Sequence, residues 1–239
     1  MASKFVFARR EKKYLLDQTQ YDALLQTLAD YMTVDAYGKY TICNIYLDTP
    51  DYALIRASLE KPTYKEKLRL RSYGVPTEED TVFLELKKKC DGTVYKRRAA
   101  LPLADARRYL KQGTETPDDS QIMRELDWSL RRYQPEPRVF IAYDREAYQG
   151  IDDPELRITF DTDICWRQER LSLEEGAWGN PLLSDGQVLM ELKTLGTMPL
   201  WLSRRLTALK IFPTSFSKYG TCYREYLAEP APQRGVTCA

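Results

Sequence analysis

The sequence predicts an α+β protein built on a closed antiparallel β-barrel of about eight strands, with helices packed on its outside. Two observations carry this prediction. Several short segments alternate apolar with charged residues, and successive side chains of a strand point to opposite faces. Helix-like segments separate these strands and can cover the apolar outer face, which leaves the charged face to line the interior.

The segment from Lys65 to Arg71 shows the alternation most clearly. In a strand, one face carries only cations, and the other carries Leu68 and Leu70. The cations are Lys65, Lys67, Arg69 and Arg71. Like charges repel one another, so this face favours a bound anion.

The first half of the chain predicts one helix and five strands. A first strand carries Arg9, Glu11 and Lys13, and residues 17–31 form a helix with apolar residues at helical spacing. Further strands cover residues 40–48, 64–73, 81–89 and 94–101. Cys90, Asp91 and Gly92 predict a hairpin turn between the last two strands.

The second half repeats this mixture of elements. Helices are predicted at residues 103–111 and 120–133, the second one with Ser120 as an N-cap. Strands follow at residues 138–148, 156–161, 164–169 and 187–194. A helix from Pro199 to about residue 210 comes next, and a last helix begins near Ser215 or Ser217. We expect one domain, residues 1–228, and a disordered tail, residues 229–239.

Composition excludes several classes of function. The chain has 239 residues, is 43% hydrophobic and 30% charged, and has a net charge of only +1, which argues against a generally basic nucleic-acid-binding protein. It contains no histidine, so histidine metal ligands, Ser-His-Asp systems and phosphohistidine chemistry are excluded. We expect no nucleic-acid partner.

The five cysteines lack a C-x-x-C spacing and predict neither a disulfide framework nor a zinc site. There is no apolar signal segment at the N-terminus and no apolar run long enough to span a membrane. We therefore expect a reduced, cytoplasmic protein.

The charged faces together carry far more cations than carboxylates. The cations are Arg9, Lys13, Lys67, Arg69, Arg71, Lys87, Lys96, Arg98, Arg145, Arg157 and Lys193. Glu11, Glu85 and Glu191 compensate only part of this charge. A chain of phosphates is the matching ligand, because arginine binds phosphate oxygens bidentately and lysine acts as a point charge. The carboxylates suit Mg²⁺ or Mn²⁺ bridging those phosphates, and phosphoryl transfer needs no histidine.

Each pattern also has a simpler interpretation. A lone Glu-x-Lys pair, such as Glu85 with Lys87, is more often a solvated strand face. The basic alternation could be the exposed face of an open sheet that binds RNA. Ser217 and Lys218 before a helix are usually only a cap, although a helix N-terminus also binds phosphate. Several basic alternations in one chain favour the phosphate tunnel.

Seven segments, in this order, resemble the VTC domain, the catalytic domain of the vacuolar transporter chaperone polyphosphate polymerases. This family lies in the triphosphate tunnel metalloenzyme, or CYTH-like, superfamily. The segments are FARREKKY (7–14), KLRLRSYG (67–74), FLELK (83–87), AYDREAY (142–148), LRITFD (156–161), MELK (190–193) and SFSKYG (215–220). The resemblance extends from about Lys4 to Tyr226, nearly the whole chain.

The resemblance implies an enzyme that transfers the γ-phosphate of ATP to growing inorganic polyphosphate inside a barrel, with a divalent metal, Mn²⁺ or Mg²⁺. The catalytic cations are then Lys13, Arg69, Arg71, Lys87, Arg145, Arg157 and Lys218. Phosphate and nucleotide binding falls to Arg9, Lys67, Lys96, Arg98, Tyr143, Lys193 and Ser217. The metal falls to Glu191, with Glu11 and Glu85 as further candidates. The role of Arg56 stays open because its spacing to Arg69 differs from the family's pattern.

Two departures from the family bear on function. The N-terminal SPX domain and C-terminal membrane helices of eukaryotic members are missing, so we expect a free-standing, soluble form. The superfamily opens with Glu-x-Glu-x-Lys, whereas this chain has Arg9-x-Glu11-x-Lys13, which favours holding a long polyanion over hydrolysing a short triphosphate. The alternatives are a tripolyphosphatase or nucleoside triphosphatase of the same fold, and a polyphosphate-binding module without turnover.

Overall fold

A computed structural model describes residues 9–91, 93–112 and 118–228, without the side chains of Arg9 and Gln112. The predicted tail, residues 229–239, lies outside the described residues.

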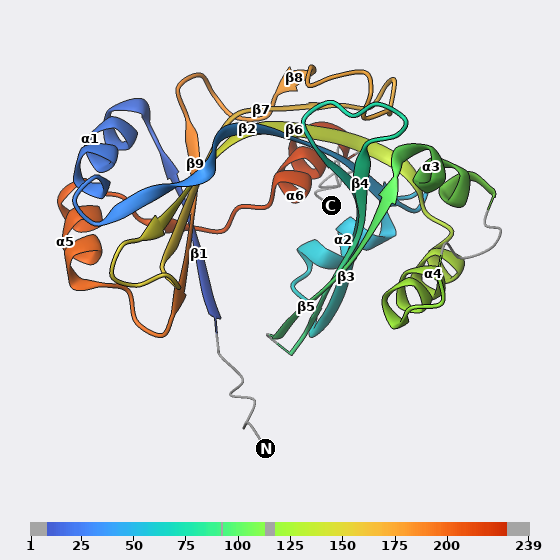
Figure 1. Cartoon of the computed structure of the whole chain (residues 1–239), viewed down its shortest axis with the longest axis horizontal. Coiled ribbons are helices and arrows are strands. Elements are labelled where there is room, and N and C mark those ends of the chain that lie inside the picture. Colours follow the sequence, from blue (N-terminus) through green and yellow to red (C-terminus); the bar gives the residue numbers. More distant parts are fainter. Residues whose placement is uncertain (1–8, 92, 113–117, 229–239) are drawn as a thin grey trace, which may run out of the picture.

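Strands and helices alternate along the chain (Figure 1). The elements are β1 (Arg9–Leu16), α1 (Gln18–Leu28), β2 (Met32–Asp48), α2 (Ala53–Leu59), β3 (Tyr64–Tyr73), β4 (Thr81–Cys90), β5 (Thr93–Pro102), α3 (Leu103–Gln112), α4 (Gln121–Tyr133), β6 (Glu136–Gly150), β7 (Arg157–Arg167), β8 (Asn180–Pro181), β9 (Val188–Leu195), α5 (Leu200–Ala208), β10 (Pro213–Thr214), α6 (Lys218–Cys222) and a π-helical turn (Tyr223–Leu227). The prediction of an α+β protein with a large antiparallel sheet is confirmed.

The strands form one antiparallel sheet in the order β10-β1-β9-β7-β6-β2-β3-β4-β5, with β8 beside β7. The sheet curves into an arch, with β5 at one edge and the β1–β10 pair at the other (Figure 1). Within the described part of the chain these edges do not pair, so the strand pairing does not show the closed barrel that the sequence predicts. Apolar–charged alternation decides which side chains face inward, whereas closure depends on strand tilt and stagger, which alternation does not specify.

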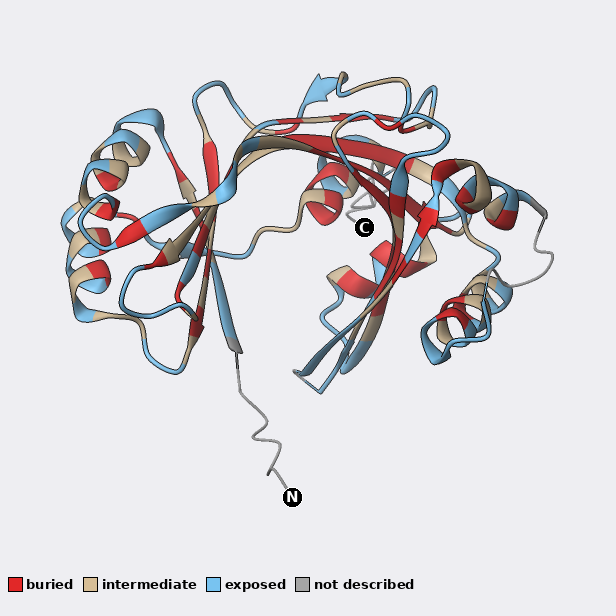
Figure 2. Ribbon diagram, viewed as in Figure 1, coloured by how far each residue is buried: buried red, intermediate tan, exposed pale blue. Residues whose placement is uncertain are grey.

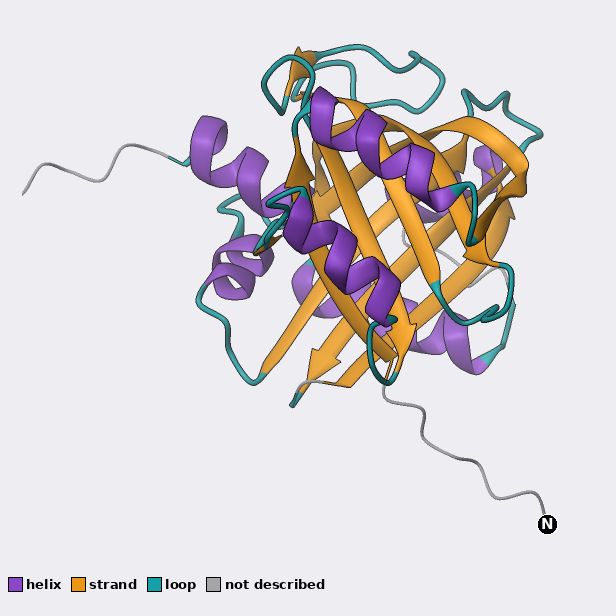
Figure 3. Ribbon diagram, turned by 90° about the vertical axis from the view of Figure 1, so that its left-hand side faces the viewer, coloured by secondary structure: helices purple, strands orange, loops and turns teal. Residues whose placement is uncertain are grey.

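Two pairs of helices cover the convex face of the arch (Figures 1 and 3). Helices α1 and α5 bury Leu24 and Leu202 against Tyr14, Phe160 and Met190 of β1, β7 and β9. Helices α3 and α4 lie over the strands at the other end of the sheet. There the core contains Leu68, Leu70, Leu84 and Leu86 together with Ala106, Met123 and Leu126. Buried residues follow the sides of the helices that face the sheet (Figure 2).

The concave face has a small apolar core of its own around α6. Tyr219 of α6 stacks on Tyr46 of β2, with ring centroids 4.6 Å apart. Ile42, Ile141, Leu189 and Cys222 belong to the same buried cluster. This packing fixes α6 inside the arch, and the rest of the concave face is free to carry charge.

Some predicted element boundaries differ from the structure. The predicted strands 156–161 and 164–169 form a single strand, β7, whose pairing with β6 is interrupted by a bulge between Ala142 and Asp144. Asp163 there has a left-handed backbone, φ 51°. Helix α2 was not predicted. Its first N–H groups are capped by Asp48, which lies too far back along the chain to give a local signal.

Asp48 ties α2 and α6 to the sheet through the hydrogen bonds of its carboxylate. Its carboxylate is fully buried and accepts from the backbone N–H groups of Thr49, Leu54 and Ile55 at 2.8, 2.9 and 3.0 Å. The Tyr219 hydroxyl donates to Oδ2 at 2.9 Å. Burial raises the pKa of Asp48 and outweighs the opposing effect of these bonds.

We expect Asp48→Ala to lower the free energy of unfolding by about 1–3 kcal/mol or more, because it leaves buried donors without an acceptor. Urea unfolding followed by intrinsic fluorescence measures this loss. Asp51→Ala, a change to an exposed carboxylate in the same loop, is the matched control and should alter stability little. Equal stability of the two variants would contradict the structural role of Asp48.

Candidate functional site

The concave face of the arch brings the predicted cations and carboxylates together from seven strands and one helix. We call the face of β1, β9, β7 and β6 the first wall. It contributes Glu11, Lys13, Glu191, Lys193, Arg157, Tyr143 and Arg145. We call the face of β3, β4 and β5 the second wall. It contributes Lys67, Arg69, Arg71, Glu85, Lys87, Lys96 and Arg98.

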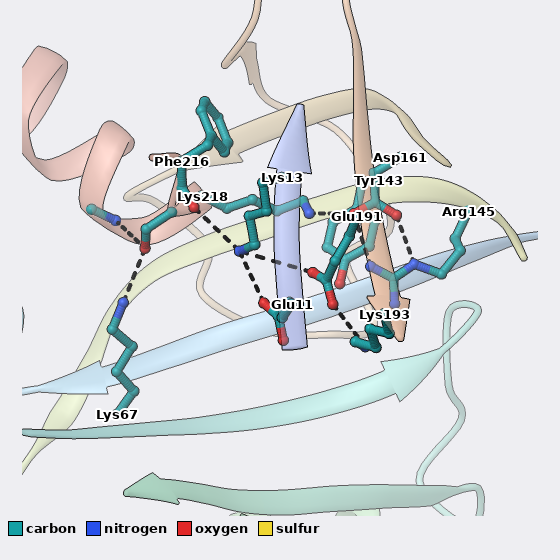
Figure 4. Close-up of polar contacts among 12 residues, drawn as sticks. Glu11, Lys13, Lys67, Tyr143, Arg145, Asp161, Glu191, Lys193, Phe216 and Lys218 are labelled. Atoms are coloured by element: carbon teal, nitrogen blue, oxygen red, sulfur yellow. Dashed lines mark hydrogen bonds and ion pairs between the residues drawn. The ribbon is translucent and has the colours of Figure 1, made fainter. Parts of the chain in front are cut away.

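Ser217 and Lys218 at the start of α6 reach both walls. The Lys67 ammonium donates to the Ser217 hydroxyl at 2.9 Å, and Lys218 forms an ion pair with Asp161 of β7 (Figure 4). Arg9 lies opposite Leu195 in the β1–β9 pair, and its side chain is outside the described part of the chain.

Glu85 is the counter-charge of the second wall. Its carboxylate, only 2% exposed, accepts from Arg69 Nε at 2.7 Å and Arg98 Nε at 2.6 Å, and Lys96 Nζ lies 2.8 Å away. Burial alone would raise the pKa of Glu85, but Arg69, Arg71 and Lys96 lower it well below its usual value. The carboxylate therefore stays ionised and holds the cations in fixed positions.

Arg71 is the most buried cation of the second wall. Its Nε donates to Asn44 Oδ1 at 2.8 Å, and its Nη2 donates to the Tyr143 hydroxyl at 3.1 Å. Neighbouring Arg69 donates to the Tyr46 hydroxyl at 3.4 Å. Asn44 and Tyr46 were not predicted as site residues, because their sequence context is that of an ordinary apolar strand.

Asp161 is the counter-charge of the first wall, and it was not among the predicted site residues. It accepts from Arg145 in bidentate geometry, at 2.6 Å for Nε–Oδ1 and 2.8 Å for Nη2–Oδ2, and it also binds Lys218. Burial raises its pKa, but Lys218 and Arg145 together lower the pKa of Asp161 to about 2. The available signal was that Asp161 shares a strand face with Arg157, four residues earlier.

Tyr143 lies between the two walls. Its hydroxyl accepts from Arg71, and Lys218 Nζ lies 4.0 Å from the centre of its ring. Burial raises its pKa, but Arg71, Arg145 and Lys218 lower the pKa of Tyr143 to about 8. The phenol thus serves as an acceptor within a cluster of cations.

Glu11 and Glu191 lie on either side of Lys13 in the paired strands β1 and β9. The Lys13 ammonium is 3.8 Å from Glu11 and 3.9 Å from Glu191, and it donates to the carbonyl oxygen of Phe216 at 3.2 Å (Figure 4). Lys193 forms a closer ion pair with Glu191, at 2.7 Å. Burial raises the pKa of Glu191, but Lys193 and Lys13 lower it to about 2.

This carboxylate pair fits a hard divalent cation. Among the described residues no group of three acidic, histidine or cysteine side chains could hold a metal ion by itself. Mg²⁺ and similar ions bound with phosphates need only one or two carboxylates, since water and phosphate oxygens complete the shell. Glu191 has one close cation, Lys193, whereas the oxygens of Glu85 have three close partners, two arginines and a lysine.

Two lysines of the second wall lack a carboxylate partner. Lys67 and Lys87 form no ion pair within the ranges that the structure describes. Burial and, to a smaller degree, the charges of Lys13 and Lys65 lower the pKa of Lys67 to about 7. Burial likewise lowers the pKa of Lys87, although Glu11 opposes this. The site therefore has positive charge that an anion would stabilise.

Fold and site together define an α+β protein whose curved antiparallel sheet carries a polybasic concave face. The VTC domain model matches residues 8–226, and the chain belongs to the VTC domain family. No curated protein matches the sequence. Within the described ranges, none of the helices combines the length and apolar character that crossing a membrane requires.

Two solved structures share the fold at low sequence identity. A proposed adenylate cyclase from Bacillus halodurans has 15% identity and a TM-score of 0.55, and the alignment covers 90% of this chain and 96% of that one. A proposed adenylyl cyclase from Hippeastrum, described as having a dominant triphosphatase activity, has 16% identity and a TM-score of 0.54, with 92% and 97% covered.

We expect tripolyphosphate binding at pH 8 to take up close to one proton at Lys67. Above about pH 7 the free side chain is mostly neutral, and a bound anion favours the charged form. Well below pH 7, Lys67 of the ligand-free protein is already protonated, so tripolyphosphate binding takes up no proton there. At such a pH the charge of Lys67 contributes fully to the affinity for tripolyphosphate. Calorimetry in buffers of different ionisation enthalpy measures the protons taken up.

Lys67→Met is the test variant for this prediction, since it keeps the length of the side chain without the titrating group. It should remove the uptake at pH 8, whereas the exposed change Lys12→Met should preserve it. Identical proton uptake by wild type and Lys67→Met would place the titration elsewhere.

Proposed function

We propose that this protein is a metal-dependent polyphosphate polymerase that transfers the γ-phosphoryl group of ATP to a growing inorganic polyphosphate chain. The observation that carries the proposal is the concave face, where two walls of arginines and lysines surround too few carboxylates to neutralise them. Membership of the VTC domain family and the triphosphate tunnel fold support an enzyme that acts on nucleoside or inorganic polyphosphates.

Fixed cations suit phosphoryl transfer because this reaction depends mainly on alignment and on neutralisation of charge at the transferred group. In the proposed mechanism, Arg69 and Arg71 hold phosphates from the second wall. The phosphates are held from the other side by Arg145 and Arg157 of the first wall and by Lys218 of α6. Glu85 and Asp161 anchor four of these five cations, so little side-chain ordering is required when substrate binds.

The remaining cations lengthen the binding surface for a polymer. Lys13 and Lys87 act as point charges beside the reacting phosphates. The wider set of phosphate contacts comprises Arg9, Lys67, Lys96, Arg98, Tyr143, Lys193 and Ser217. Repeated cations at strand spacing match a linear chain of phosphates better than a single compact anion.

Glu191 and Glu11 would hold the divalent metal, Mn²⁺ or Mg²⁺. A bound metal would neutralise charge on the phosphate oxygens and orient them. Lys13, which lies between the two carboxylates, would then turn from them toward the phosphates. We leave Glu85 out of the proposed metal site because its oxygens are occupied by the cations of the second wall.

A triphosphatase acting on tripolyphosphate or a nucleoside triphosphate is the second candidate. The Hippeastrum protein with the same fold is described as a triphosphatase, and water could replace the acceptor phosphate in the same geometry. A non-catalytic polyphosphate-binding module would bind the same ligands and leave ATP intact.

Incubation of the purified protein with ATP and Mn²⁺ or Mg²⁺ should give ADP and polymer that exopolyphosphatase degrades and alkaline phosphatase does not. Glu191→Gln should lower turnover at least about 100-fold through loss of a metal ligand, with phosphate affinity largely kept. Glu79→Gln, an exposed change in the loop before β4, is the control. Release of orthophosphate without polymer would favour the triphosphatase, and unchanged ATP the binding module.

Arg69→Ala should weaken ATP binding by roughly 1.5–3 kcal/mol, because it removes a charge-assisted contact to phosphate. Calorimetric titration in EDTA measures binding without turnover. Arg204→Ala, at an exposed position of α5, serves as the control for loss of one positive charge. An unchanged dissociation constant for the Arg69 variant would remove Arg69 from the proposed site.

A further inference from the structure

We propose that four aromatic side chains at one end of the concave face bind the nucleobase of the ATP donor by stacking. We call this group the aromatic rim: Tyr37 and Tyr40 of β2, Tyr73 of β3 and Phe83 of β4. The inference rests on the proposed function in one respect, namely that the tunnel takes a nucleoside triphosphate. It assigns a place to the part of ATP that the charged walls cannot recognise.

The four rings form a continuous series across three neighbouring strands. Ring centroids are 6.1 Å apart for Tyr37–Tyr40, 6.1 Å for Tyr40–Tyr73 and 5.6 Å for Tyr73–Phe83. Interplanar angles of 73°, 55° and 78° show that the rings meet edge to face or tilted. The rings therefore do not cover one another's faces, although the guanidinium of Arg98 lies over Phe83 and near Tyr73.

The outer members of the rim are exposed although they are large and aromatic. Tyr37 is 80% exposed and Tyr73 is 47% exposed, whereas Tyr46 and Tyr219 deeper on the concave face are buried. Burial in a core therefore does not account for these two rings. A flat π-surface open to solvent beside a phosphate site is the kind of surface on which bases stack.

The rim adjoins the phosphate-binding cations on both walls. Tyr73 follows Arg71 by two residues on the same strand face, a separation of about 6.6 Å along the strand. Tyr40 lies directly opposite Arg145 in the pairing of β2 with β6. A ribose and its first phosphate can occupy such a separation, which leaves the outer phosphates on Arg69, Arg71 and Arg145.

Arg98 connects the aromatic rim to the charged network. Its guanidinium lies 4.5 Å from the ring centroid of Phe83 and 5.8 Å from that of Tyr73, and its Nη2 donates to the Tyr73 hydroxyl at 3.1 Å. The same side chain is held by Glu85. Tyr73 is thus oriented by the carboxylate that orients Arg69.

Stacking would distinguish donor from product. Inorganic polyphosphate has no π-surface, so only a nucleotide gains from the aromatic rim, and all phosphate chains gain from the cations. Base stacking on aromatic side chains tolerates different bases, so the rim should favour nucleotides as a class and purines over pyrimidines through their larger surface.

The test compares two ligands on one set of variants. Dissociation constants for ATP and for tripolyphosphate are measured by calorimetry in EDTA, where neither is turned over. Tyr73→Ala and Tyr37→Ala should each weaken ATP binding at least about fivefold, which is the lower end expected for one stacked base, and should change tripolyphosphate binding less than about twofold.

Three further variants separate the ring from other effects. Tyr73→Trp should restore ATP affinity, and Tyr73→Phe should retain it, since both keep an aromatic face and only the hydroxyl bond to Arg98 is lost. Tyr95→Ala removes a similarly exposed tyrosine, 46% exposed, from the opposite face of β5 and should leave both affinities unchanged.

Two results would overturn the nucleobase site. The first is an unchanged ATP affinity in both alanine variants. The second is an equal loss of affinity for ATP and tripolyphosphate, which would mean that the aromatic rim acts on the phosphate site. The polymerase proposal is tested separately, by analysing the products that the protein forms from ATP. Selective loss of ATP affinity together with release of orthophosphate alone would support the nucleobase site and reject the polymerase.

Discussion

Two buried carboxylates, Glu85 and Asp161, make the concave face of this sheet possible. A row of cations on one strand face is unfavourable in a partly desolvated setting, since like charges repel strongly there. Each carboxylate binds cations from more than one element: Glu85 joins β3 to β5, and Asp161 joins β6 to α6. The same ion pairs that allow the strands to fold thereby hold the arginines in place for an anionic ligand.

The two faces of the sheet differ in character because successive side chains of a strand point to opposite sides. Apolar residues on the convex face bury themselves under α1, α3, α4 and α5, and this burial supplies the core of the protein. Most of the concave face therefore need not bury apolar residues and can carry charged ones. The exception is the cluster around α6, where Tyr46 and Tyr219 stack and Asp48 caps α2. That local core positions Lys218, the only cation of the site that comes from a helix within the described chain.

Local patterns predicted the α+β class, most strands and helices, and the face on which each charged residue lies, because strand alternation is a property of neighbouring residues. The features that depend on contacts between distant segments were missed. A closed barrel was predicted, whereas the strand pairing of the described chain leaves β5 and the β1–β10 pair apart. Helix α2 was overlooked because its cap, Asp48, precedes it by several residues. Asp161 was passed over although it shares a strand face with Arg157, because its partner Arg145 lies on another strand and local patterns do not show which strands pair. The roles of Glu11 and Glu191 at a metal stay predictions.

The unpaired edges of the arch change how a polymer could reach the cations. In a closed barrel, a continuous ladder of backbone hydrogen bonds surrounds the bore, so a long chain must be threaded from one end. Here β5 and β1 share no ladder in the described part of the chain, and their spacing is set by the bending of the sheet. Under the proposed function, this open side would give an extended polyanion a lateral route to the cations, besides entry from the ends.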